Sequence, residues 1–314
     1  MGTEVTVIAA DTPETASLIG AGRDLFSEQE SRFSRFRADS ELSEVNSGAV
    51  HRCSPAFQSV LRRAMAWHSV TGGDFDPAVL PVLSAAGYGV TFERITTQSA
   101  KPGDGLATTP GRRPVFADII SDDGFQHVQL PVEVQIDLSG IVKGWTVDRA
   151  AELLSPLGHF VVDAGGDIYA HGDSPDCEGW FVGLEDPRAP GTDHSYVLIE
   201  NSSVATSGTY RRRWQPAAGT PAHHLIDPRT GAPADDRVMA VSVIGPSTET
   251  CEVYAKAALI RGPEQGLALL ETTSGLSGIM TLADGSTLRT ADWQGLDAYR
   301  ARTVAEADAG AANA

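Results

Sequence analysis

The chain has 314 residues, of which 41% are hydrophobic and 21% are charged, as is typical of a globular protein with a substantial core. Its 41 acidic residues outnumber its 24 basic residues, so the formal net charge is −17 and nucleic acid and anionic lipid surfaces are poor partners. Its three cysteines form no CxxC pair, which argues against a structural zinc site and against a disulfide framework.

The N-terminal segment shows no targeting signal. It lacks the basic start and the apolar run of a signal peptide, and an alternating strand pattern begins almost at once, over residues 3–10. No stretch reaches the roughly 18 consecutive apolar residues that a membrane-spanning helix needs. We therefore expect a cytoplasmic protein without a membrane span.

The first part of the chain predicts helices joined by turns. A helical pattern covers 12–36, with Thr12 at the position of an N-cap. A second helix is expected over 54–73, because Ser54 precedes a proline at its start and two glycines lie at its end. The stretch 92–116 is rich in Gly, Pro and Thr, which favours an extended surface loop.

The remainder of the chain is dominated by short strands. An acidic turn at 121–124 predicts a hairpin, and a helix is expected from about 144 to 157. A strand pattern over 159–172 is interrupted by two glycines. Further strands are expected at 180–187, 195–208, 239–247 and 277–290, and one or two helices at 250–271. Runs of strands broken by a few long helices predict an α+β fold.

A junction between a strand and a helix stands out in the stretch QIDLSGIVKGWTVDRA, residues 135–150. Gly140 would let a ligand approach the backbone closely. The start of the following helix, together with the positive charge of Lys143, suits a phosphate group. Asp148 and Arg149, by contrast, are interpreted as a pair on the helix surface.

Two other segments carry residues that chemistry could use. In TGGDFDPAVLPV, Asp74 and Asp76 flank Phe75; a helix end and a turn would account for the glycines there but not for this arrangement. In HHLIDPRTGAPA, His223 and His224 precede a turn, and a histidine that titrates near neutral pH is a natural acid or base.

Taken in order, these segments resemble the family of ApbE-type FAD:protein FMN transferases, over roughly residues 1–290. The resemblance rests on the initial Met-Gly-Thr and on SRFRADSELSEVN, GGDFDPAV, IDLSGIVKGWTVDRA, DAGGDI, VATSG and HHLIDPRTGAP, which follow the order of the family's motifs. It implies an α+β fold with mixed or antiparallel sheets and packed helices, and an FAD cleft between two lobes. We expect one such domain over 1–300 and a frayed, acidic, Ala-rich tail at 301–314.

The resemblance also implies an activity. Members of the family bind FAD and Mg2+ and move the FMN half of FAD onto a threonine hydroxyl of an acceptor protein, releasing AMP. Some members instead hydrolyse FAD to FMN and AMP, and a degenerate member would bind FAD without transfer. His224 would be the catalytic base. The implied FAD contacts are Met1, Phe36, Asp74, Phe75, Asp76, Asp137, Lys143 and Ile226.

The metal motif of the family corresponds here to CEVYAKAALIRG. The resemblance implies Gly140 and Glu252 as the Mg2+ ligands, with Glu252 in place of the family's aspartate. Lys256 stands where the family has a threonine, and a lysine has only hydrogen-bond donors and cannot bind a metal. We expect Lys256 either to act in catalysis in place of the metal or to pair with Glu252 as an ordinary i,i+4 surface pair.

Overall fold

The computed structural model describes residues 3–95, 116, 119–122, 124, 126–132, 134–215 and 221–297. The predictions for Met1, for most of the 92–116 loop and for the 301–314 tail lie outside these residues. The helices are α1 (Thr15–Phe33), α2 (Glu41–Val45), α3 (Pro55–Val70), α4 (Leu80–Ala85), α5 (Ser139–Leu154), α6 (Thr248–Arg261) and α7 (Pro263–Thr272), with the short 3-10 helices η1 (Pro77–Val79), η2 (Phe92–Arg94) and η4 (Ser155–Leu157).

The strands of the described part form one large sheet and several small ones. They are β1 (Val5–Ala9), β2 (His51–Arg52), β3 (Ile120–Ser121), β4 (His127–Gln129), β5 (Phe160–Ala164), β6 (Asp167–His171), β7 (Trp180–Glu185), β8 (Asp193–Ile199), β9 (Ser202–Gly208), β10 (Arg213–Trp214), β11 (Ala222–His223), β12 (Ile226–Asp227), β13 (Ala232–Pro233), β14 (Val238–Gly245), β15 (Ser277–Leu282), β16 (Thr287–Arg289) and β17 (Leu296–Asp297).

The large sheet has seven strands in the order β1-β5-β6-β9-β14-β15-β16, and every neighbouring pair is antiparallel. The predicted strand at 159–172 is in fact the hairpin β5–β6. Its two glycines do not interrupt a strand but form the turn, with φ of 64° at Gly165 and 91° at Gly166. Two successive positive φ values suit a tight hairpin turn, and glycine reaches them at little cost.

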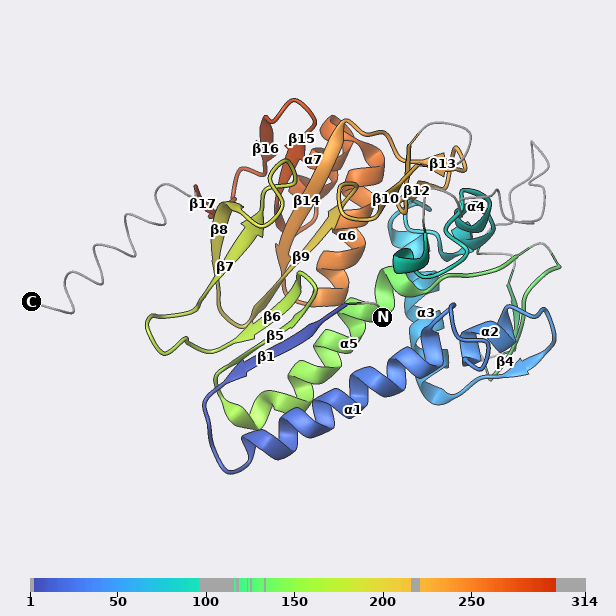
Figure 1. Ribbon diagram of the computed structural model, residues 1–314, viewed down its shortest axis with the longest axis horizontal. Coiled ribbons are helices and arrows are strands. Elements are labelled where there is room, and N and C mark those ends of the chain that lie inside the picture. The colour runs from blue at the N-terminus through green and yellow to red at the C-terminus, as the bar shows by residue number, and fades with distance from the viewer. Residues whose placement is uncertain are drawn as a thin grey trace, which may run out of the picture.

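Each face of this sheet is covered by a different layer, as the arrangement in Figure 1 shows. Because strand side chains alternate between the two faces, neighbouring residues of β5 enter different clusters. Val162 packs with residues of α5, whereas Val161 packs with residues of the small sheet β17-β8-β7. The helices α5, α6 and α7 lie on the first face, with α1 outside α5. This layering confirms the predicted α+β fold.

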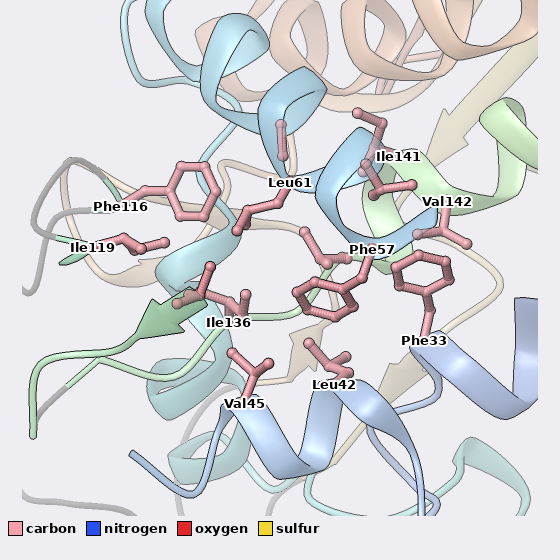
Figure 2. Close-up of a cluster of buried hydrophobic side chains, with 14 of the residues drawn as sticks. Phe33, Leu42, Val45, Phe57, Leu61, Phe116, Ile119, Ile136, Ile141 and Val142 are labelled. Carbon is pink, nitrogen blue, oxygen red and sulfur yellow. The ribbon is translucent and has the colours of Figure 1, made fainter. Parts of the chain in front are cut away.

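A second cluster of buried side chains lies where the helices α1, α2 and α3 meet the start of α5 (Figure 2). Phe33 and Phe57 stack at its centre with ring centroids 5.5 Å apart. Ser54 accepts a hydrogen bond from the Phe57 N–H and so caps α3, as the sequence predicted. The cluster also contains Ile141 of α5 and Val253 of α6, so it fixes the junction from which the candidate site is built.

Two predicted helix starts are wrong. The first helix begins at Thr15 rather than near Thr12, because the Thr15 hydroxyl donates to Ala10 O and holds the preceding residues in a turn. The helix expected from about 144 begins at Ser139, because Asp137 Oδ1 accepts the Ser139 N–H at 2.8 Å and satisfies a free donor of the first turn. Gly140 therefore lies inside the first turn of α5.

Among the described helices, none combines the length and apolar composition that a bilayer-spanning segment requires. The cytoplasmic location and the extent of the domain stay predictions.

Candidate active site

The site is built on the contact between α5 and the start of α6, where the two backbones come very close. A Cβ at Gly144 would lie 2.8 Å from the backbone of Thr248 and Glu249, so only glycine fits there. Asp148 accepts the N–H groups of both residues, at 2.7 and 3.0 Å. These are free donors at the start of α6, so a carboxylate satisfies them well.

The predicted surface pair of Asp148 and Arg149 is therefore wrong. Arg149 pairs with Glu152 on the exposed side of α5 at 2.7 Å. Asp148 instead faces α6 and stabilises its N-terminus. The sequence could not indicate this, because the two capped residues lie 100 and 101 positions further along the chain.

Gly140, Glu252 and Lys256 meet at this contact. Lys256 Nζ donates a hydrogen bond to Gly140 O at 2.8 Å and lies 3.8 Å from Glu252 Oε1. Glu252 Oε2 accepts the Gly144 N–H at 2.9 Å. The Lys256 ammonium also lies 5.8 Å from the centroid of the Phe75 ring. The side chains of Lys256 and Glu252 are only 18% and 7% exposed, so they do not form an ordinary surface pair.

The residues present do not fit Mg2+. This ion prefers six oxygen ligands in near-octahedral geometry. Here the Gly140 carbonyl and Glu252 have an ammonium beside them, and a lysine contributes no ligand. Within the ranges that the structure describes, no group of three or more His, Cys, Asp or Glu side chains is placed to hold a metal ion.

Lys143 lies in the second turn of α5 and forms an ion pair with Asp167, at 2.9 Å. Asp167 begins β6, directly after the Gly165-Gly166 turn, and its side chain is 1% exposed. Burial raises the pKa of this carboxyl to about 7; Glu252 raises it too, while Lys143 and Lys256 oppose the shift. The side chain of Lys143 therefore has an acidic partner within the fold, and its predicted contact with FAD stays a prediction.

A buried arginine that the sequence did not single out connects three of the predicted FAD contacts. Arg35 Nε pairs with Asp137 Oδ2 at 3.0 Å, and the guanidinium carbon lies 4.1 Å from the Phe36 ring centroid and 4.5 Å from that of Tyr88. Tyr88 belongs to the same cluster as Ile226. Arg35 Nη2 is buried and has no hydrogen-bond partner among the described residues. Such an unpaired donor is costly, and a ligand oxygen would satisfy it.

The three residues of the DFD segment have different surroundings. Asp74 is buried and pairs with Arg261 at the end of α6, with Arg229 also 3.9 Å away. Phe75 packs in the cluster of Figure 2 and contacts the position of Gly140. Asp76 accepts the Ala78 N–H at 2.8 Å and caps η1. The contact of these three residues with FAD stays a prediction. Of the three, Phe75 is the one whose ring faces the Lys256 ammonium.

His224 is half-buried, in the turn between β11 and β12. Its burial holds the pKa of the imidazole well below the usual value, and the positive charges of Arg212 and Lys256 lower it further. Nδ1 has no hydrogen-bond partner among the described residues. His223 is fully buried instead, and its Nε2 bonds to Ala234 O at 3.0 Å, which is a structural role. The neutral ring of His224 can accept a proton.

A predicted cleft between two lobes stays a prediction. A surface hollow of about 580 Å3 is present in the described part of the chain, but it is lined by Glu41, His51, Gln126 and their neighbours. None of the predicted site residues lines it.

Comparison with known proteins identifies the family of this chain. The model of the ApbE family matches residues 1–280. The FAD:protein FMN transferase of Vibrio cholerae is 30% identical over 261 residues, which cover 79% of this chain and 74% of the relative. The enzyme of the same name from Treponema pallidum is 30% identical over 276 residues, covering 83% and 75%. This chain belongs to the ApbE family.

Solved structures of ApbE proteins share the fold. The ApbE protein of Thermotoga maritima superposes with a TM-score of 0.79 at 25% identity, over 92% of this chain and 94% of the other. The flavin transferase ApbE of Vibrio cholerae gives a TM-score of 0.74 at 25% identity, over 93% and 94%. The α+β fold that the ApbE resemblance implied is therefore confirmed.

Two buried charged groups beside the candidate site of this ApbE-family chain were missed from the sequence. No motif marks Arg35, and only its buried contacts with Asp137 and with two aromatic rings distinguish it. Asp167 lay within the DAGGDI motif, but nothing in the motif names its partner. Both became visible because the fold places them against the start of α5.

Proposed function

We propose that this chain is an FAD:protein FMN transferase, which moves the FMN half of FAD onto a threonine hydroxyl of an acceptor protein and releases AMP. The proposal rests on the arrangement of three side chains. Lys143 lies near the start of α5, and the ammonium of Lys256 reaches the same turn from α6. The neutral His224, whose Nδ1 has no hydrogen-bond partner among the described residues, lies within the electrostatic reach of Lys256. In a member of the ApbE family, this set suits the cleavage of a pyrophosphate.

The reaction is a displacement at phosphorus. The threonine oxygen attacks the phosphorus on the FMN side of the pyrophosphate, and a new P–O bond forms. The bond from that phosphorus to the bridging oxygen breaks, so AMP leaves with the bridging oxygen. The hydroxyl proton passes to His224. Such reactions depend mainly on positioning and on stabilisation of the charge on the phosphate oxygens.

Each proposed role matches the chemistry of its side chain. The ammonium of Lys256 stabilises the phosphate oxygens, and Lys143 adds a second positive charge. Phe36, which is 40% exposed, and Ile226 contact the ring systems of FAD. The other FAD contacts in the proposal are Met1, Asp74, Phe75, Asp76 and Asp137.

The experiment is to incubate the purified protein with FAD, with and without an acceptor protein that carries a threonine flavinylation site. Release of AMP together with covalent flavin on the acceptor, in equal amounts, supports transfer. AMP and FMN released without any acceptor would show hydrolysis instead. FAD binding with no AMP in either reaction would leave a binding protein and would overturn the proposal.

A further inference from the structure

Two pairs of groups meet where α5 contacts α6. One pair is the Gly140 carbonyl and the Gly144 N–H on α5, and the other is Glu252 and Lys256 on α6. The members of each pair are four residues apart. In a regular helix the Gly140 carbonyl and the Gly144 N–H bond to each other. Here Lys256 Nζ donates to this carbonyl at 2.8 Å, and Glu252 Oε2 accepts this N–H at 2.9 Å. Because both bonds follow from the docking of α6 on α5, the position of the ammonium is fixed by the fold.

The ammonium occupies the space that a metal ion would need. An ion held by Gly140 O and Glu252 would lie between these groups, and Nζ is 2.8 Å from the first and 3.8 Å from the nearer Glu252 oxygen. A Cβ at Gly140 would come within 2.6 Å of Nζ and 3.4 Å of the Phe75 ring, so the space is closed on that side. A divalent ion so near to an ammonium would also be repelled by it.

The same ammonium can still serve an anion. A lysine ammonium has three donors, and one of them is directed to Gly140 O. Glu252 Oε1, at 3.8 Å, lies beyond hydrogen-bond distance. With its side chain 18% exposed, Lys256 can offer its remaining donors to an arriving phosphate oxygen. Glu252 then holds the ammonium in place by charge, as it would hold a metal ion.

We propose that the Lys256 ammonium takes the place of a divalent cation in this site, so that the chain binds FAD and cleaves its pyrophosphate without Mg2+. The bonds made and broken are those given for the transfer reaction, and only the source of the neutralising charge differs. The statement about cleavage rests on the proposed function, whereas the statement about FAD binding does not.

The first test compares the metal-stripped, full-length protein in EDTA and in millimolar MgCl2. FAD affinity is followed by flavin fluorescence, and binding of Mn2+ in the presence of FAD by electron paramagnetic resonance. We expect the same Kd for FAD in both buffers, within about twofold, and no protein-bound Mn2+ signal. FAD that binds only in MgCl2, or does not bind at all, would overturn the proposal, as would a stoichiometric Mn2+ signal.

The second test changes the cation itself. Lys256→Met keeps most of the length of the side chain but removes the charge, and should weaken FAD binding by about tenfold to a hundredfold, the range for one charge-assisted hydrogen bond. Added Mg2+ should not restore the affinity. Arg149→Met removes an exposed charge from the other side of α5 and is the matched control, expected to bind FAD normally. Far-UV circular dichroism checks that each variant is folded.

A double variant tests whether a metal site can be restored in place of the ammonium. Lys256→Thr with Glu252→Asp removes the ammonium and supplies oxygen ligands, so it should bind Mn2+ and should bind FAD more tightly in MgCl2 than in EDTA. The proposal would be contradicted if the double variant bound FAD equally well in MgCl2 and in EDTA and Lys256→Met also bound FAD with unchanged affinity.

The two proposals can fail separately. FAD binding that is insensitive to EDTA and lost in Lys256→Met, with no AMP formed under any condition, would refute the transferase activity and leave the built-in cation. AMP formation and flavinylation that require Mg2+ would support the transferase activity and refute the built-in cation.

Discussion

At the scale of single residues, His224 shows how a fold can prepare a base. Burial disfavours the charged imidazolium, and the nearby positive charges of Arg212 and Lys256 disfavour it further, so the pKa of His224 lies well below the usual 6.5. The ring is consequently neutral at physiological pH and can accept the proton of a hydroxyl.

His224→Gln should lower AMP release by about a hundredfold to ten-thousandfold while FAD still binds, because the variant removes only the general base. In the unchanged protein, activity should be lost as the pH falls through the depressed pKa of His224, so the acid limb of kcat/KM lies below pH 6.5. The measurement is the pH profile of AMP release. An acid limb at or above 6.5, or a variant of normal activity, would exclude His224 as the base.

Arg35 is a second residue whose contacts bear on FAD binding. Its guanidinium contacts the rings of Phe36 and Tyr88 and pairs with Asp137, so a change there disturbs several predicted FAD contacts at once. Arg35→Gln should weaken FAD binding by about tenfold or more, because it removes a charged donor and leaves the buried Asp137 without its ion-pair partner.

Titration of flavin fluorescence with FAD measures this effect. Arg37→Gln is the control, since Arg37 pairs with Asp39 on the surface, with side chains 49% and 73% exposed, and should leave the affinity unchanged. Equal affinities of the Arg35 variant and the unchanged protein would show that Arg35 only supports the fold.

Some residue roles could be predicted from the sequence and others could not, for a physical reason. The motif order brought Gly140, Glu252 and Lys256 together, and the structure places them in contact. The partners of Lys143 and Asp148 are long-range, since Asp167 lies beyond a hairpin turn and Thr248 is 100 positions away. Local patterns carry no information about such contacts.

At the scale of elements, the site depends on the distance between α5 and α6. Gly144 allows the backbones to approach, and Asp148 satisfies the first N–H groups of α6. The sequence placed the start of α5 five residues too late, because the two glycines of the junction disfavour a helix by propensity. Tertiary packing against α6 outweighs that preference.

Gly144→Ala should destabilise the protein by about 1–3 kcal/mol, because the added methyl group would lie 2.8 Å from the backbone of α6 and force the helices apart. Gly20→Ala in α1 is the matched control, since nothing lies within 4 Å of its Cβ position. It should be neutral or stabilising by up to about 1 kcal/mol. Urea unfolding measures both; a Gly144 variant as stable as the control would refute the close contact.

At the scale of the whole molecule, the buried clusters are connected through the helices. The cluster of Figure 2 contains Ile141 of α5 and Val253 of α6, and further along α5 Val147 enters the cluster of the large sheet. We therefore propose that residues 1–300 form one cooperative unit, as the family resemblance implied. The layering over the sheet followed from strand alternation, whereas the strand order depended on long-range pairing that no local pattern indicates.

Thermal unfolding in EDTA should show a single transition. FAD at about a hundred times its Kd should raise the free energy of unfolding by roughly 2.7 kcal/mol and shift the whole transition upward. Calorimetry checks this directly. Two transitions, of which FAD shifts only one, would contradict a single cooperative unit.

In the proposed reaction, this site receives the pyrophosphate of FAD, and Lys256 neutralises its charge. The most direct test is a crystal structure of the protein with FAD, grown in the presence of MgCl2. We expect a phosphate oxygen bonded to Lys256 Nζ, with the ammonium still between Gly140 O and Glu252 and no metal there. A metal ion bound by Gly140 O and Glu252, with the lysine displaced, would contradict it.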